Sequence, residues 1–307
     1  MRINIRSTLL LLFLLIFNIQ SFAQSHQNSE ASEIPFTMKE GFVIVDAKIQ
    51  GKVPVKVVLS TGIEFSLTDL SLLEKYKLQA SYAADGPVTG RMDKTFTFTI
   101  VSDVSVGSSK SKTLHMRFGT LSNVSAIVGQ EIFATLGADF FDGQIVQFDF
   151  KKNVVRFLDK VPPDLSKKDS SQNTAGRMVL RMEPEADNPF RKTYQIAYVK
   201  DIQFNGKKGS LLFDTGMSTY LAVSSSTAQK IGFTVPDETS SPSEEKVTLR
   251  CDAFELGGLR ALVYAKGSTA DQRLSKYGVV AGSMFLSDFV SLFDFKKGYI
   301  YLESAKP

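Results

Sequence analysis

The sequence predicts an all-β protein that contains two copies of one structural unit, and two observations predict it. Its apolar residues fall in short runs rich in Val, Phe, Ile and Thr, separated by Gly, Ser, Asp and Pro, which is typical of strands rather than helices. Several landmarks of the first half also return in the same order in the second half. We therefore expect a duplicated β-rich fold.

The chain of 307 residues opens with the features of a cleavable export signal. Two arginines precede an apolar stretch from Leu9 to Phe17, and Ser21-Phe22-Ala23 supplies the small residues expected before a cleavage site. We expect residues 1–23 to be a signal peptide cleaved after Ala23, and the protein to be secreted or periplasmic. The stretch is shorter than the roughly 20 residues that span a bilayer, so we expect no membrane span after cleavage.

The remaining elements follow in chain order. Residues 24–33 are predicted to be a flexible extension. Strands are predicted at Phe42–Ile49, Val53–Leu59, Thr95–Val101, Ile145–Phe150 and Tyr194–Phe204. Short helices are predicted at Leu70–Tyr76, at Ser225–Lys230, and directly after Gly137 and Gly282.

The duplication sets the expected domain boundaries. Paired landmarks are Ser60-Thr61-Gly62 with Asp214-Thr215-Gly216, Val106-Gly107 with Leu256-Gly257, Leu136-Gly137 with Ala281-Gly282, and Phe148-Asp149-Phe150-Lys151-Lys152 with Phe293-Asp294-Phe295-Lys296-Lys297. The polar segment 162–177 has too few apolar residues to order itself and is predicted to be a linker. It separates a first lobe, residues 34–161, from a second lobe, residues 178–307.

The segment Leu211-Leu212-Phe213-Asp214-Thr215-Gly216-Met217-Ser218 resembles the active-site strand and loop of the pepsin and retropepsin superfamily of aspartic peptidases. The resemblance covers both halves of the chain. It implies a bilobal fold with pseudo-twofold symmetry and a central cleft that binds polypeptide. It further implies that Asp214 is the catalytic base, that Thr215 braces the loops, that Gly216 permits their close approach, and that Ser218 supports the carboxylate.

The first lobe departs from this pattern at its functional positions. Thr61 and Gly62 are present, but Ser60 replaces the first catalytic aspartate and Glu64 replaces the supporting Ser or Thr. In the family, two facing aspartates share one proton, so that one acts as base and the other as acid. The pKa of a serine hydroxyl is too high for that role. Glu64 is the one nearby carboxylate that could substitute for the missing aspartate.

Two polar segments lie where the family places mobile hairpins. Gly86-Pro87-Val88-Thr89-Gly90 matches the position of the flap that closes over substrate, and an ordinary turn explains the same residues equally well. The corresponding run of the second half, Thr239–Lys246, is expected to be a solvated loop.

Several classes of protein are disfavoured. The net charge of +4 is spread along the chain, which gives no case for nucleic acid. A single cysteine, Cys251, excludes an internal disulfide and a thiolate metal cluster. We expect no metal and no cofactor, because no His, Asp or Glu residues show ligand spacing and no nucleotide-binding motif occurs. The expected ligand is polypeptide, and the expected state is a monomer.

Three functions remain open on this scaffold. The first is a pseudo-peptidase that binds extended polypeptide and cleaves it weakly or not at all. The second is an active aspartic endopeptidase that uses Asp214 with Ser60 or Glu64. The third is an envelope interaction protein without enzymatic activity, in which the cleft is closed or filled.

Overall fold

The apolar runs of the sequence form the strands of two lobes that share one sheet. The computed structural model describes residues 32–85, 94–163, 165, 176–184, 192–238, 240–252 and 254–304. The predicted signal peptide and the predicted flap residues 86–90 lie outside these ranges, as does most of the predicted linker. From Glu33 onward the chain clusters as one compact unit.

The first lobe is built of antiparallel hairpins with short helices between them. Its strands are β1 (Ile34–Lys39), β2 (Phe42–Ile49), β3 (Val53–Leu59), β4 (Leu67–Thr68), β5 (Ala80–Asp85), β6 (Lys94–Val106), β7 (Ser109–Phe118), β8 (Ala134–Leu136), β9 (Ile145–Asp149) and β10 (Val154–Leu158). Its helices are η1 (Leu70–Leu72), α2 (Leu73–Tyr76), α3 (Ser122–Val128) and α4 (Ala138–Phe141).

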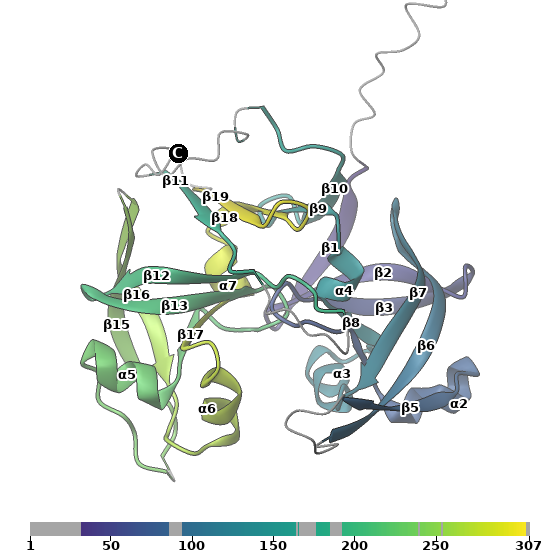
Figure 1. Ribbon diagram of the computed structural model, residues 1–307, viewed down its shortest axis with the longest axis horizontal. Coiled ribbons are helices and arrows are strands. Elements are labelled where there is room, and N and C mark those ends of the chain that lie inside the picture. The colour runs from purple at the N-terminus through teal and green to yellow at the C-terminus, as the bar shows by residue number, and fades with distance from the viewer. Residues whose placement is uncertain are drawn as a thin grey trace, which may run out of the picture. The chain divides into compact units, whose positions relative to one another are not determined.

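The second lobe contains a closed barrel in the order β12-β13-β17-β14-β16-β15 (Figure 1). Its strands are β11 (Arg177–Arg181), β12 (Tyr198–Phe204), β13 (Lys207–Asp214), β14 (Leu221–Val223), β15 (Ser243–Cys251), β16 (Phe254–Val263), β17 (Val279–Gly282), β18 (Phe289–Asp294) and β19 (Tyr299–Ser304). Its helices are α5 (Ser225–Ile231), α6 (Thr269–Leu274) and α7 (Ser283–Leu286).

The two lobes repeat one strand topology, as the duplicated landmarks predict. In the first, β3 pairs in parallel with β8, β8 pairs antiparallel with β4, and β4 pairs in parallel with β7. In the second, β13, β17, β14 and β16 pair in the same way. Both Ser60 and Asp214 therefore stand at the end of a strand that lies beside the strand leading to a landmark glycine, Gly137 in the first lobe and Gly282 in the second. The predicted all-β bilobal fold is confirmed.

A sheet shared by the two lobes joins them, in the order β11-β19-β18-β9-β10-β1. The two copies of the Phe-Asp-Phe-Lys-Lys landmark meet there, because β9 pairs antiparallel with β18. Phe148 and Phe293 are fully buried, and their ring centroids lie 5.9 Å apart in an edge-to-face arrangement. Burial of such large aromatic surfaces is a main source of stability in a chain without disulfides.

Four segments differ from the sequence-based expectation. The strand predicted at Tyr194–Phe204 begins only at Tyr198, because the main-chain N–H of Ala197 donates to the carbonyl oxygen of Thr61 in the first lobe (3.0 Å) instead of continuing a ladder. The run predicted to be a loop at Thr239–Lys246 enters strand β15 at Ser243, since this strand pairs with β16 along the barrel. Helices α3 and α6 were not predicted.

Within the described ranges, no helix combines the length and the apolar character needed to cross a lipid bilayer.

Candidate active site

The two loops singled out in the sequence face each other at the centre of the structure. Ser60 follows β3 and its main-chain N–H donates to the carbonyl oxygen of Leu136 (2.9 Å), while Asp214 ends β13. Ser60 is 1% exposed and Asp214 is 9% exposed. The strand register thus presents one side chain from each lobe to a common buried point.

The two threonines bind the opposite loops reciprocally. The Thr61 hydroxyl donates to the carbonyl oxygen of Phe213 and the Thr215 hydroxyl donates to the carbonyl oxygen of Leu59, both at 2.8 Å. Each threonine Oγ1 also accepts the main-chain N–H of the other threonine at 3.2 Å. Both threonines are fully buried. This symmetric network satisfies backbone groups that would otherwise be buried without partners, so it ties the loops in one arrangement.

Ser60 and Asp214 are directly hydrogen-bonded. The Ser60 hydroxyl donates to Asp214 Oδ1 at 2.6 Å, and the Gly216 N–H donates to the same oxygen at 2.8 Å. Burial raises the pKa of Asp214, and the hydrogen bonds from Ser60 and from the Gly216 and Gly62 amides oppose that rise. The site therefore holds one buried carboxyl group and one hydroxyl that is hydrogen-bonded to it.

Both loops require a glycine. Gly62 of the first loop lies against Asp214 of the second, and Gly216 of the second loop lies against Ser60 of the first. A Cβ atom at Gly62 would lie 2.5 Å from the Asp214 Cβ, and one at Gly216 would lie 2.6 Å from the Ser60 Cβ. Real Cβ contacts are not this short, so any larger residue would push the two loops apart. The close approach of Ser60 and Asp214 depends on these two positions.

The positions expected to support the two loops lie farther out. Ser218 is exposed and lies against Gly41, where an added Cβ would come within 2.6 Å of the Ser218 Cβ. Its support of the Asp214 carboxylate stays a prediction. Glu64 is half-buried, and its main-chain carbonyl oxygen accepts the N–H of Asp139 (3.1 Å).

A buried carboxyl group that the sequence analysis missed lies behind the first loop. Asp139, in α4, accepts hydrogen bonds from the Ser66 hydroxyl (2.6 Å) and from the Ser66 N–H (2.9 Å). Burial raises the pKa of Asp139 to about 6. Ser66 Oγ in turn accepts the Gly137 N–H (3.0 Å), so the group joins the first loop to the residue that follows β8. The sequence feature that could have pointed to this carboxyl group is its place two residues after Gly137, one of the paired landmark glycines.

A pocket of about 570 Å³ covers the site. Its lining comes from both lobes and is mostly apolar, with Asp214, Glu64, Arg117 and Arg273 as the charged members. No sequence motif pointed to the two arginines, because they are far apart in the chain and belong to none. The pocket is large enough for several peptide side chains.

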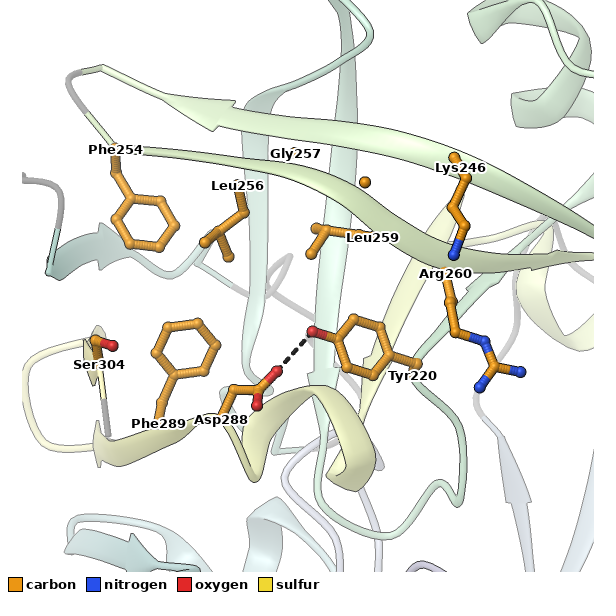
Figure 2. Close-up of a pocket in the computed structure, with 11 residues that line it drawn as sticks. Tyr220, Lys246, Phe254, Leu256, Gly257, Leu259, Arg260, Asp288, Phe289 and Ser304 are labelled. Carbon is orange, nitrogen blue, oxygen red and sulfur yellow. Dashed lines mark hydrogen bonds between the residues drawn. The ribbon is translucent and has the colours of Figure 1, made fainter. Parts of the chain in front are cut away.

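A separate pocket of about 450 Å³ lies between β16 and the start of β18 (Figure 2). Its polar residues include Tyr220, whose hydroxyl donates to Asp288 Oδ2 at 2.6 Å. Neither Ser60 nor Asp214 lines it. Among the described residues, no three His, Cys, Asp or Glu side chains gather closely enough to hold a metal ion.

The two-lobed architecture and the facing loops define the fold of a pepsin-like aspartic proteinase. Among solved structures, the chain is similar to an aspartic proteinase from Irpex lacteus, with 12% sequence identity and a TM-score of 0.50. The match covers 90% of this chain and 98% of that one, and at this identity it shows the fold alone. No protein-family model matches the sequence. No curated protein sequence matches it either.

Proposed function

We propose that this protein is a pseudo-peptidase, which binds extended polypeptide over the Ser60–Asp214 loops and hydrolyses it weakly or not at all. The hydrogen bond from the Ser60 hydroxyl to Asp214 carries this proposal. Peptide hydrolysis in this fold needs one carboxylate as base and a second carboxyl group as acid. A hydroxyl provides neither a shared proton nor a usable acid near neutral pH. Loss of one such group costs about 10²- to 10⁴-fold in rate.

The pocket favours a binding role over a purely structural one. It is open, and it lies directly over Asp214 with lining from both lobes. A closed or filled site, which the third function requires, would leave no such volume. An extended chain in this pocket would pass between the two lobes and contact both.

An active endopeptidase is the second candidate, favoured by two observations. Burial raises the pKa of Asp214, which makes this carboxyl group a better proton acceptor once it is ionised. Glu64 lines the same pocket, and is thus the nearest candidate for a second carboxyl group. This function requires cleavage that is lost when Asp214 is replaced.

Binding of an unfolded, fluorescein-labelled polypeptide separates these functions. Anisotropy should rise with wild type, and the probe should be recovered uncut. Binding should survive both Asp214→Ala and Asp214→Asn. The asparagine variant retains a side-chain oxygen that can accept a hydrogen bond from the Ser60 hydroxyl. Absence of binding by wild type would reject the proposal. Cleavage that disappears in Asp214→Asn would favour the active endopeptidase.

We also propose that the protein is exported, with its signal removed after Ala23, and that it acts as a monomer. The sequence Ser21-Phe22-Ala23 after an apolar stretch supports export. The tethered pair of loops supports a monomer, since each loop already has its partner within the chain. Mass spectrometry of the cell-derived protein should find Gln24 at the N-terminus, and sedimentation should give the mass of one chain.

A further inference from the structure

An unpaired strand edge borders the pocket of about 450 Å³ beside β16 (Figure 2). Within the part of the chain that the structure describes, β16 pairs with β15 along its length but with β14 only at residues 261–263. Residues 256–260, which line the pocket, therefore have no neighbouring strand on the pocket side. An edge of this kind presents main-chain groups with which another strand can pair.

A bulge leaves part of this edge without a partner on β15 as well. The register of the β15–β16 ladder shifts here, so that Gly257 and Gly258 lie opposite the single residue Thr248. The main chain of Thr248 bonds in the other direction, because its N–H donates to Asn205 Oδ1 and its carbonyl oxygen accepts the Asn205 N–H, both at 2.9 Å. Both glycines are exposed, and neither has a side chain to cover its main chain. Their N–H and C=O groups are therefore available to a ligand.

The wall across the pocket from this edge is aromatic and held in place. Phe289 faces β16 there, and its ring centroid lies 6.3 Å from that of Phe254 (Figure 2). The Tyr220 hydroxyl donates to Asp288 Oδ2 at 2.6 Å, and the Tyr220 ring meets Phe285 edge-on at a centroid distance of 5.5 Å. Because side chains alternate between the two faces of a strand, an added strand would direct every second side chain to one face. Apolar side chains suit the face that meets these rings.

The charges around the pocket are balanced. The Arg260 guanidinium donates twice to Glu244 Oε2, at 2.8 and 3.2 Å, and Lys246 Nζ lies 3.8 Å from Glu244 Oε1. Asp288 supplies a second carboxyl group. Two cations thus face two carboxyl groups, so the groove favours a partner with uncharged side chains.

We infer that this groove binds an extended segment of a partner polypeptide, which joins β16 as an added strand and turns uncharged, apolar side chains toward Leu256 and Phe289. In strand addition, main-chain hydrogen bonds provide affinity and the contacts of alternate side chains provide selectivity. The groove shares no lining residue with the pocket over Asp214, so this is a second binding surface and does not depend on the proposed function.

A fluorescein-labelled nine-residue peptide of alternating Thr and Val tests the inference by anisotropy with the full-length protein. Two further peptides are N-methylated at every Val or at every Thr, which removes the N–H donors of one strand edge and leaves the side chains unchanged. The plain peptide should bind, and at least one methylated peptide should bind about tenfold more weakly, because an added strand pairs through one edge.

Leu256→Lys should weaken binding of the plain peptide about tenfold, because it places a charge where an apolar side chain must pack. Leu70→Lys is the matched control, since Leu70 is an exposed leucine that does not line the groove. It should leave binding unchanged.

Hydrogen exchange locates the bound peptide. The amides of residues 254–260 should exchange more slowly in its presence, and those of residues 211–216 should not change. Protection confined to residues 211–216 would overturn the inference and leave the proposed function intact. Equal binding of all three peptides, or no binding of the plain peptide, would overturn the strand addition. A dimer in sedimentation that Leu256→Lys dissociates would show that the groove holds a second copy of the chain instead.

Discussion

Replacing Thr215 with valine tests how the two loops are held together. Valine keeps the shape of the side chain but removes the hydroxyl that donates to the Leu59 carbonyl oxygen at 2.8 Å and accepts the Thr61 N–H at 3.2 Å. Leu59 and Thr61 are fully buried, so water cannot replace the lost partner. A buried backbone group left unsatisfied costs about 1–3 kcal/mol. Two such groups predict a loss of about 2–6 kcal/mol in the free energy of unfolding.

Urea denaturation at neutral pH measures this loss from the shift in midpoint at constant slope. Thr113→Val is the control, because Thr113 is an exposed residue of β7 and undergoes the same chemical change. It should alter the free energy of unfolding by no more than about 0.5 kcal/mol. A loss below about 1 kcal/mol for Thr215→Val would show that the reciprocal hydroxyl network does not brace the loops.

Two further predictions concern the neighbourhood of the site. Gly216→Ala should lower the free energy of unfolding by about 1–3 kcal/mol, because its Cβ would crowd the Ser60 Cβ at 2.6 Å. Gly257→Ala, whose Cβ would meet only Thr248 Oγ1 at 3.8 Å, should be close to neutral in the same urea titration. Burial raises the pKa of Asp139 to about 6 from an ordinary 3.8, so its contribution to stability is complete below pH 3.8 and is lost as the pH rises through 6. The stability advantage of wild type over Asp139→Asn should therefore be about 2 kcal/mol larger at pH 4 than at pH 7, and an equal advantage at both pH values would contradict the assignment.

The local pattern of apolar runs and turn residues is sufficient to predict most of the fold. The strands Phe42–Ile49 and Val53–Leu59 were predicted with their observed bounds, because Gln50 and Gly51 both adopt positive φ in the tight turn between them. The missed helix α6 begins after Ser268, whose hydroxyl accepts the Asp271 N–H. That Ser-x-x-Asp spacing is a capping signal, but a helix this short gives no apolar periodicity to accompany it.

The site was only partly predictable, because its parts meet through tertiary contacts. Ser60 and Asp214 were found from paired landmarks, and they lie within hydrogen-bonding distance of each other. The hydrogen bond of Asp139 to Ser66 depends on how α4 packs beneath the first loop, and no spacing rule gives it. Arg117 and Arg273 enter one pocket only because β7 and α6 approach it from different lobes.

We propose that the serine at position 60 leaves a binding site in place of a catalytic one. Cleavage of an unfolded protein mixture from pH 3 to 8 tests it most directly, with wild type, Ser60→Asp, Asp214→Ala and Ser60→Asp combined with Asp214→Asn compared side by side. Wild type should show little or no cleavage. Ser60→Asp should cleave about 10²- to 10⁴-fold faster, best at acid pH, and this cleavage should be lost in the combined variant. Cleavage by wild type as fast as by Ser60→Asp, and abolished in Asp214→Ala, would contradict it and show that one aspartate is enough.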